Sequence, residues 1–183
     1  TSSDVRRVIP RINWQSGTVY EMYRNNYSST NRTSQTATSS LYGSNYYILT
    51  SEFKVYLCIN NGSDPENPKG KTSKFEPTHT STTVPAADNT ATGDGYQWKY
   101  LYTIAPADIV KFVTTSYIPL PEKWGDVSTK TIKDAAVDGK LETIVINRRG
   151  TATVDGVDGD ISGIPIIGDG TGGTATALSL IHI

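Results

Sequence analysis

The segment from Gly93 to Ile104, with the sequence GDGYQWKYLYTI, constrains the fold of this chain more than any other. A Gly-Asp-Gly turn leads into a stretch with a large ring at every second position: Tyr96, Trp98, Tyr100 and Tyr102. Successive side chains of a strand point to opposite faces, so we expect all four rings on one face of a sheet. The run contains no catalytic residue type on the ring face. It therefore favours packing or interaction over catalysis.

The composition indicates a β-rich, nearly neutral protein. The chain has 183 residues, enough for one well-packed domain with or without a small appendage. It carries 17 basic and 18 acidic residues, so it lacks the basic surplus typical of nucleic-acid binding. Tyrosines (11) outnumber phenylalanines (3), and such amphipathic rings are common in strands and at interfaces.

Cys58 is the only cysteine, which excludes an intramolecular disulfide and leaves a thiolate metal site without partners. It stands in the apolar run Val55–Ile59, where we expect a buried thiol. No apolar stretch approaches the roughly 20 residues of a membrane span, and the N-terminus lacks a secretory signal pattern. The segment Asp4–Pro10 is typical of the middle of a domain, and the chain stops on Leu178–Ile183. We therefore expect a fragment at both ends.

Local patterns predict a mainly β fold: an antiparallel β-sandwich with long loops and one or two short helices. Tyr46–Leu49 and Phe53–Ile59 are predicted strands of a hairpin closed by a turn at 50–52. Ala105–Phe112 has a proline in its first turn followed by an acidic residue, which predicts a short helix. Tyr117–Leu120 is predicted to be a brief strand.

Two polar stretches are predicted to be loops, Ser28–Ser40 and the proline-rich connection Asn60–Pro85. Long connections of this kind are often functional or contact partners. Leu141–Ile146 is a predicted strand, and from Gly150 onward the chain is mostly Gly, Asp, Thr and Ala. We expect a sheet domain at residues 1–125 and a glycine-rich β module at residues 126–183.

Ligand-binding motifs are incomplete. Gly62 lies too far from Gly70-Lys71-Thr72 for a phosphate-binding loop, and no helix can open at the proline that follows. The acidic residues of the segment 155–160 lack the alternation of a helix-loop-helix calcium site, and turn formation is the simpler explanation for them. We therefore predict no metal and no cofactor.

Catalytic groups are also sparse. The two histidines are His79, in a polar loop, and His182, near the C-terminus, so a nucleophile would lack a base and zinc would lack ligands. A glycosidase-like pair of carboxylates stays open, and its candidates are Glu52, Asp94, Glu122 and Asp126. Stacking of sugars on the tyrosine and tryptophan rings is a second alternative.

Four stretches, taken in order, carry a family resemblance. They are Val8–Arg11 with Trp14 close behind, Val55–Cys58, Gly93–Tyr102 with Ile104 and Pro106, and Tyr117–Pro121. Together they resemble the baseplate wedge protein of T-even-like contractile-tailed bacteriophages, the gene-eight product family, over about Asp4 to Gly125. The Gly-Asp-Gly-Tyr-x-Trp-x-Tyr-Leu motif is the specific part. The stretch from Gly139 to Ala177 departs from that family and is similar to glycine-rich β repeats of phage virion proteins.

The resemblance implies a structural subunit of a phage tail baseplate, located in the virion, made in the host bacterial cytoplasm and without a catalytic site. It implies partners among the wedge proteins of the gene-six, gene-seven and gene-ten product types. A homodimer of the isolated chain is a further expectation. The residues expected to serve structure or interfaces are Trp98, Tyr96, Tyr100, Tyr102, Gly93 and Gly95. The alternative function is a carbohydrate-binding or adhesin β module of a phage virion.

Overall fold

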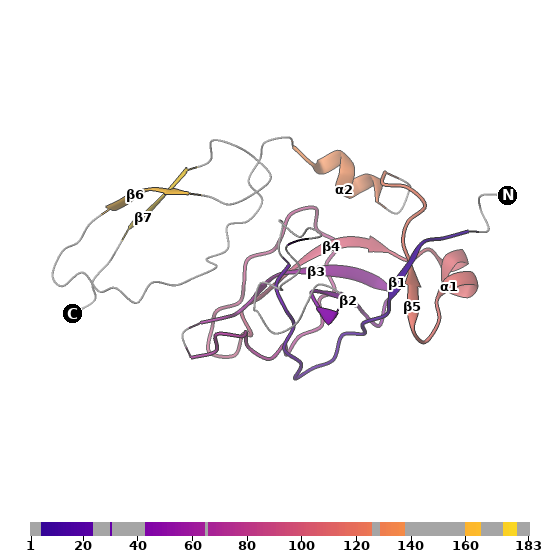
Figure 1. Cartoon of the computed structure of the whole chain (residues 1–183), viewed down its shortest axis with the longest axis horizontal. Coiled ribbons are helices and arrows are strands. Elements are labelled where there is room, and N and C mark those ends of the chain that lie inside the picture. The colour runs from indigo at the N-terminus through magenta and orange to yellow at the C-terminus, as the bar shows by residue number, and fades with distance from the viewer. Residues whose placement is uncertain are drawn as a thin grey trace.

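The computed structural model describes residues 5–23, 30, 43–64, 66–125 and 129–137, together with the backbone of residues 160–165 and 174–178. The elements follow one another along the chain as shown in Figure 1. They are β1 (Val8–Pro10), β2 (Tyr47–Leu49), β3 (Lys54–Asn61), β4 (Tyr96–Thr103), α1 (Pro106–Phe112), β5 (Tyr117–Pro119), α2 (Lys130–Ala135), β6 (Asp160–Pro165) and β7 (Thr174–Leu178). The predicted mainly β fold with antiparallel sheets and short helices is confirmed.

A three-stranded antiparallel sheet with the order β2-β3-β4 forms the centre of the described structure. β2 and β3 form the predicted hairpin, with Ile48 opposite Tyr56 and Leu49 opposite Val55. In the turn between them Phe53 has a φ of 56°, a left-handed conformation that few non-glycine residues adopt. β4, which is eight residues long, then pairs with β3, so the predicted aromatic strand is central to the fold.

The expectation that all four rings of β4 share one face is wrong for Tyr102. Tyr100 is opposite Tyr56 and Tyr102 is opposite Val55, so β4 has one extra residue, Leu101, between the two pairs. Val55 and Tyr56 are adjacent in β3 and point to opposite faces. Tyr102 therefore lies on the face opposite to Tyr100, because a bulge shifts the alternation by one residue.

Each face of the sheet is consequently covered by its own hydrophobic cluster. The first cluster contains Tyr20, Ile48, Tyr56, Cys58, Tyr96 and Trp98, with Ile12, Trp14 and Tyr100 packed against it. The second contains Leu49, Val55, Tyr102, Ile104 and Ile118, with Ile9, Ile109 and Val113 among the side chains packed against it. Because both faces are buried, the sheet is the middle layer of the described body.

The second face is covered by a small ladder and by α1. β1 and β5 pair antiparallel, with Ile9 opposite Ile118, and both of these side chains point toward the sheet. α1 packs beside β5. Arg6 joins the two parts: its guanidinium lies 3.4 Å from the Asp108 carboxylate and 5.4 Å from the centre of the Phe112 ring. The β1 segment was not predicted to be a strand, because three residues ending in proline carry almost no local signal.

Other chain segments cover both outer edges of the three-stranded sheet. Beside β2, the Trp14 N–H donates to the Leu49 carbonyl at 2.9 Å, and the Leu49 N–H donates to the Ile12 carbonyl at 2.7 Å. Beside β4, the Gln97 side-chain amide donates to the Pro85 carbonyl at 3.0 Å. Covered edges protect a sheet from pairing with foreign strands. The connection 60–85, predicted to be a loop, thus lies against the sheet in its described part.

At the C-terminal side, β6 and β7 pair antiparallel. α2 was not predicted; Ile132 is its one buried residue. The predicted strand Leu141–Ile146, the acidic segment 155–160 up to position 159, His182 and all of the loop 28–40 except Thr30 lie outside the described residues. Among the residues that are described, no helix is long and apolar enough to cross a membrane.

Candidate functional site: the aromatic core and its entry turn

The turn that precedes β4 is organised by the carboxylate of Asp94, which is 6% exposed. One of its oxygens accepts hydrogen bonds from the backbone N–H groups of Lys74, at 2.8 Å, and Phe75, at 3.4 Å. The other accepts from the N–H of Tyr96 at 3.1 Å. A carboxylate that accepts several backbone N–H groups is well satisfied without a cation. Asp94 therefore fastens the long connection to the first residue of the aromatic strand.

The glycines beside Asp94 permit close backbone contact. Gly95 has a φ of +73°, and a Cβ added to it would lie 3.0 Å from the Cα of Gly62. Gly62 has a φ of +66°, and its own added Cβ would overlap the Asp94 carbonyl oxygen. A Cβ on Gly93 would likewise overlap the carbonyl oxygen of Asp88. The end of β3 and the start of β4 can approach this closely because these positions carry no side chain.

Gly95→Ala is expected to lower the free energy of unfolding by about 2 kcal/mol, from left-handed backbone strain plus the contact with Gly62. Gly17→Ala is the matched control, because Gly17 has a φ of +83° and nothing within 4 Å of an added Cβ. The control is expected to lose only about 1 kcal/mol. Urea unfolding of both variants measures the difference, and equal losses would show that the contact with Gly62 contributes nothing.

The first hydrophobic cluster is built from rings that contact each other. The rings of Tyr96 and Trp98 are stacked, with centroids 5.3 Å apart and an interplanar angle of 15°. Tyr20 approaches Trp98 edge-on, with centroids 5.4 Å apart. The Tyr96 hydroxyl accepts from the Tyr20 N–H at 2.9 Å and donates to the Lys71 carbonyl at 2.8 Å. Burial raises the pKa of Tyr96, which keeps this hydroxyl protonated as a donor.

The indole N–H of Trp98 is unusual among buried polar groups. Its side chain is 5% exposed, and its indole N–H has no hydrogen-bond partner among the described residues. By contrast, the indole N–H of Trp14 donates to the Ser73 hydroxyl at 3.0 Å. Trp98 therefore contributes through apolar area and ring contacts alone.

His79 links the long connection to the outer edge of β4. The Ser81 N–H donates to its Nδ1 at 3.3 Å, so the neutral ring carries its proton on Nε2 and donates it to the Trp98 carbonyl at 3.1 Å. The His79 backbone carbonyl accepts from the Tyr56 hydroxyl at 2.5 Å, and the two rings meet edge-on at 5.3 Å. Tyr100 lies against Tyr56 on the same face. This arrangement requires a neutral imidazole.

The stability of the protein is expected to fall between pH 7 and pH 5 because of His79. Burial lowers the pKa of His79, so below about pH 6.5 the unfolded chain binds more protons at this residue than the folded chain does. His79→Gln retains an amide donor for the Trp98 carbonyl but does not titrate. Urea unfolding at several pH values should give a smaller decline for this variant, whereas identical declines would exclude His79 as the cause.

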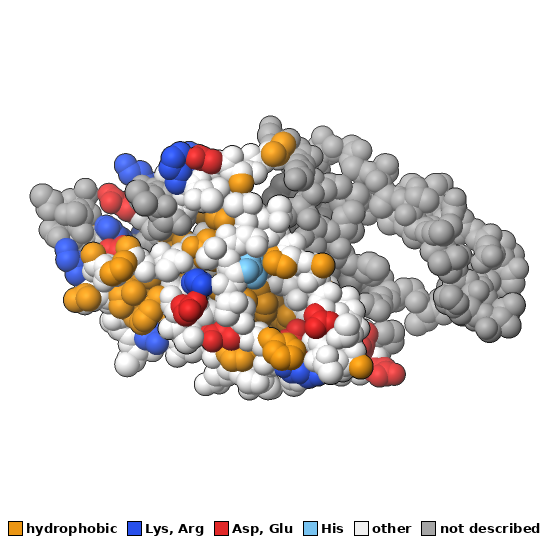
Figure 2. Space-filling model, turned by 180° about the vertical axis from the view of Figure 1, so that it is seen from behind, with side chains coloured by type: hydrophobic (Ala, Val, Ile, Leu, Met, Phe, Trp, Pro, Cys, Tyr) orange, Lys and Arg blue, Asp and Glu red, His pale blue; other side chains and the backbone are white. Residues whose placement is uncertain are grey.

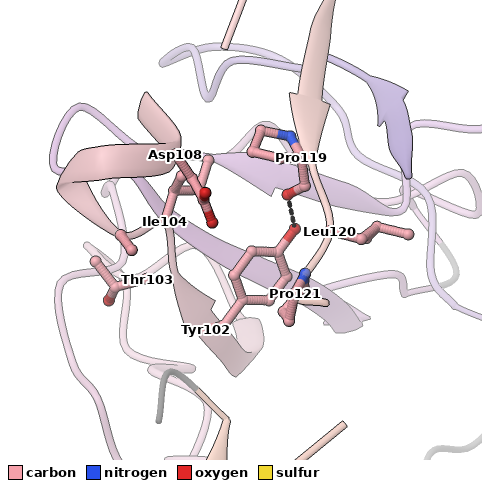
Figure 3. A pocket seen from close by; sticks show the side chains of 8 residues that line it. Tyr102, Thr103, Ile104, Asp108, Pro119, Leu120 and Pro121 are labelled. Carbon is pink, nitrogen blue, oxygen red and sulfur yellow. Dashed lines mark hydrogen bonds between the residues drawn. The ribbon is translucent and has the colours of Figure 1, made fainter. Parts of the chain in front are cut away.

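Tyr102 belongs to the second cluster. Its hydroxyl donates to the Pro119 carbonyl at 3.0 Å and so joins β4 to β5, as Figure 3 shows. Around this bond lies a small depression between β4, α1 and β5. It is lined by Tyr102, Thr103, Ile104, Ala105, Asp108, Pro119, Leu120 and Pro121. The lining combines apolar and polar surface, and its single carboxylate, Asp108, is paired with Arg6.

The other predicted site residues are dispersed. Glu52 pairs with Lys54 at 2.6 Å, and Glu122 lies 3.7 Å from Arg6. Asp126 lies outside the described residues. In the part of the chain that the structure describes, no three side chains among His, Cys, Asp and Glu gather as a metal site would require. The three described candidate carboxylates, Glu52, Asp94 and Glu122, thus have partners that serve the fold.

Lys71, which a phosphate-binding loop would point at phosphates, instead lies 3.0 Å from the Asp64 carboxylate. This pairing and hydrogen bonds from Asn67 lower the pKa of Asp64 to about 2. Gly70 packs directly on the side chain of Asn61. The segment is therefore a structural loop held by its own polar side chains.

Sequence reasoning missed two residues of this core. Tyr20 is 1% exposed at the centre of the first cluster, although the residues around it, Thr18–Tyr23, show no clear helical or strand pattern. Asn61 is fully buried, and its side-chain amide donates to the carbonyls of Tyr20, at 2.8 Å, and Lys69, at 3.1 Å. The Asn-Gly pair at 61–62 was the available signal, since this dipeptide marks a turn. Its buried amide joins three segments.

Comparison with known proteins assigns the chain. Residues 57–158 match the family Phage-Gp8, described as Bacteriophage T4, Gp8. The matched range is more than half of the chain and includes the Gly93–Tyr102 motif, whereas Val8–Arg11 precedes it. It also extends beyond Gly125 into part of the stretch that was expected to depart from the family. No curated protein and no solved structure matches the chain significantly. The chain therefore belongs to the family of bacteriophage T4 Gp8, a structural family of the phage baseplate wedge.

Proposed function

We propose that the protein links neighbouring wedge proteins in the baseplate of a contractile tail, as a rigid connector. The observation that carries this proposal is the burial of both faces of the β2-β3-β4 sheet by the chain's own segments. A body closed in this way keeps its shape when load passes from one neighbour to another, because a packed protein interior resists deformation.

The position of the rings supports a packing role for them. Tyr96 is 6% exposed and Trp98 5%, and each covers one face of the other's ring. A sugar-binding platform requires open ring faces, so these rings support the connector more than the carbohydrate-binding alternative. The turn at 93–95 also supports the packing role, because Asp94, Gly95 and Gly62 hold the start of β4 against the end of β3.

The partners that we propose are wedge proteins of the gene-six, gene-seven and gene-ten product types. The chain is made in the bacterial cytoplasm and meets these partners in the virion. Family membership supports partners within the baseplate. Surface contacts can be strong without charge, because aromatic and hydrogen-bonding side chains dominate interface energies. A homodimer of the isolated chain is part of the same proposal.

The test is a phage whose copy of this gene is deleted and supplied from a plasmid. Without the plasmid, complete baseplates should be absent from lysates fractionated by sedimentation, and wedge intermediates should accumulate. With the plasmid, purified tails should contain the chain in fixed ratio to the other wedge proteins. Complete and contractile baseplates formed without the chain would contradict the connector role.

A further inference from the structure

The side chain of Asn61, the last residue of β3, is held in a site that water does not reach. Its exposed fraction is 0%. Its amide nitrogen donates to the Tyr20 carbonyl at 2.8 Å and to the Lys69 carbonyl at 3.1 Å, so both of its N–H bonds are used. Its amide oxygen accepts from the Ser63 N–H at 3.3 Å. These hydrogen bonds fix both the position and the orientation of the amide.

The residue that follows Asn61 has to be a glycine. Gly62 has a φ of +66°, and an added Cβ would overlap the Asp94 carbonyl oxygen. Asn61-Gly62 is also the only Asn-Gly pair in the chain. Asparagine is a chemically labile residue, and it is most prone to deamidation before glycine, because no side chain then hinders attack by the next backbone nitrogen. The close contact at position 62 therefore creates a labile pair at the end of β3.

Deamidation of this pair needs only hydroxide and water. The Gly62 backbone nitrogen, after losing its proton to hydroxide, forms a bond to Asn61 Cγ. The bond from Cγ to the amide nitrogen breaks, and ammonia leaves with a proton taken from water. Water then adds to one carbonyl carbon of the resulting five-membered imide and breaks its C–N bond. The product is aspartate, or isoaspartate, in which the main chain runs through the side-chain carboxyl group.

The folded structure opposes ring closure at the atoms that react. Asn61 lies in the ladder opposite Tyr96, and the nearly planar imide ring demands a ψ at Asn61 outside the range of an extended strand. The Gly62 N–H donates to the Asn60 side-chain oxygen at 3.0 Å, which shields the proton that hydroxide has to remove. Gly70 packs so closely on the Asn61 amide that an added Cβ would overlap its nitrogen. Deamidation therefore requires this region to open.

We infer that Asn61 is a deamidation site that folding protects, and that its conversion to aspartate or isoaspartate destabilises the fold irreversibly. A carboxylate at position 61 would face the Tyr20 and Lys69 carbonyls, which are acceptors like itself. Asp94, by contrast, is buried among N–H donors. On the face that Figure 2 shows, the Asp and Glu side chains lie at the surface, where water solvates them. A buried carboxylate that faces acceptors has neither form of compensation.

The pair thus limits how long an open chain stays able to fold. A chain that folds promptly keeps the Asn61 amide, whereas a chain that remains open loses it and cannot restore the junction of β3 with the Tyr20 and Lys69 segments. This inference goes beyond the connector role and does not rest on it. Its experiments use the purified chain, so their outcome is independent of baseplate assembly.

Incubation of the purified chain at mildly alkaline pH, with and without guanidinium chloride, tests the protection. Mass spectrometry of the peptide that contains Asn61 measures its conversion to aspartate and isoaspartate. Because the folded chain reacts only when it opens, conversion should be at least about a hundredfold slower without denaturant than with it. A ratio below about tenfold would overturn the inference.

Gly70→Ala and Gly17→Ala test the contacts of the amide. Both glycines have a positive φ, +106° and +83°, so either alanine strains the backbone. A Cβ at position 70 would displace the Asn61 amide, whereas a Cβ at position 17 has nothing within 4 Å. Without denaturant, and after correction for the measured stability of each variant, Gly70→Ala should deamidate at least about tenfold faster than Gly17→Ala. Equal corrected rates would show that these contacts do not protect Asn61.

Asn61→Asp reproduces the main-chain-intact product. Its midpoint of urea unfolding at neutral pH should lie about 1 M or more below that of the unaltered chain, or cooperative unfolding should be lost. Asn60→Asp is the matched control, because it makes the same change of charge at a half-buried neighbour and keeps the acceptor of the Gly62 N–H. The control should shift the midpoint less than half as much. Equal shifts would contradict a specific cost of a carboxylate at position 61.

Discussion

Trp98→Ala is expected to lower the free energy of unfolding by about 3–5 kcal/mol, the largest effect of any single substitution considered for this protein. The ring is 5% exposed, stacks on Tyr96 and receives the edge of Tyr20. Removing it leaves a cavity between the sheet and the N-terminal segment, which the two tyrosines cannot fill without losing their hydrogen bonds. Urea unfolding followed by circular dichroism measures the loss.

Two variants make the interpretation specific. Trp124 is 57% exposed, so Trp124→Ala should change the free energy of unfolding by no more than about 0.5 kcal/mol. Trp98→Phe retains a ring for Tyr96 and removes the indole N–H that has no partner among the described residues. Its loss should be about 1–2 kcal/mol, well below that of Trp98→Ala. A loss under about 1 kcal/mol for Trp98→Ala would show that the ring is not a core residue.

Asp94→Ala is expected to lower the free energy of unfolding by about 3 kcal/mol. The substitution leaves three backbone N–H groups, those of Lys74, Phe75 and Tyr96, without their acceptor. A buried donor that loses its partner costs about 1–3 kcal/mol, and part of the Lys74–Phe75 segment can regain water. Chemical unfolding again gives the free energy, and hydrogen exchange of the Tyr96 amide should be faster in the variant.

Asp94→Asn separates charge from shape. The amide keeps one acceptor oxygen, so it should lose about half as much stability as the alanine variant. Asp88→Ala is the control, since the Asp88 carboxylate accepts from the N–H and hydroxyl of Thr90 on the surface. It should lose no more than about 1 kcal/mol. A loss at Asp94 no larger than at Asp88 would contradict the role of the carboxylate in fastening the loop to the strand.

The loss of stability expected at Trp98 and at Asp94 should also affect baseplate assembly. Trp98→Ala and Asp94→Ala weaken the attachment of segments to the sheet, and each removes a side chain that is at most 6% exposed. Once folded, they should therefore incorporate into baseplates in the normal ratio at low temperature and fail as the temperature rises.

Several elements could be predicted because their signals are local. The hairpin of β2 and β3 follows from two apolar runs and a short turn, and α1 follows from a proline and an acidic residue in its first turn. The family motif at 93–101 is also contiguous. By contrast, β1 and α2 carry weak local signals, and tertiary contacts stabilise them: β1 pairs with β5, and Ile132 of α2 is buried.

The amino-acid sequence alone determined the ring pattern of β4, the glycine turn that precedes it and the family to which these residues point. Only the tertiary structure decided that Tyr102 lies on the opposite face, because one extra residue at Leu101 shifts a pattern of period two. Only the tertiary structure revealed the hydrogen bonds between Asp94 and Lys74 and between Asn61 and Tyr20. These bonds connect residues 20 and 41 positions apart, and such pairs are selected by the packing of the whole body.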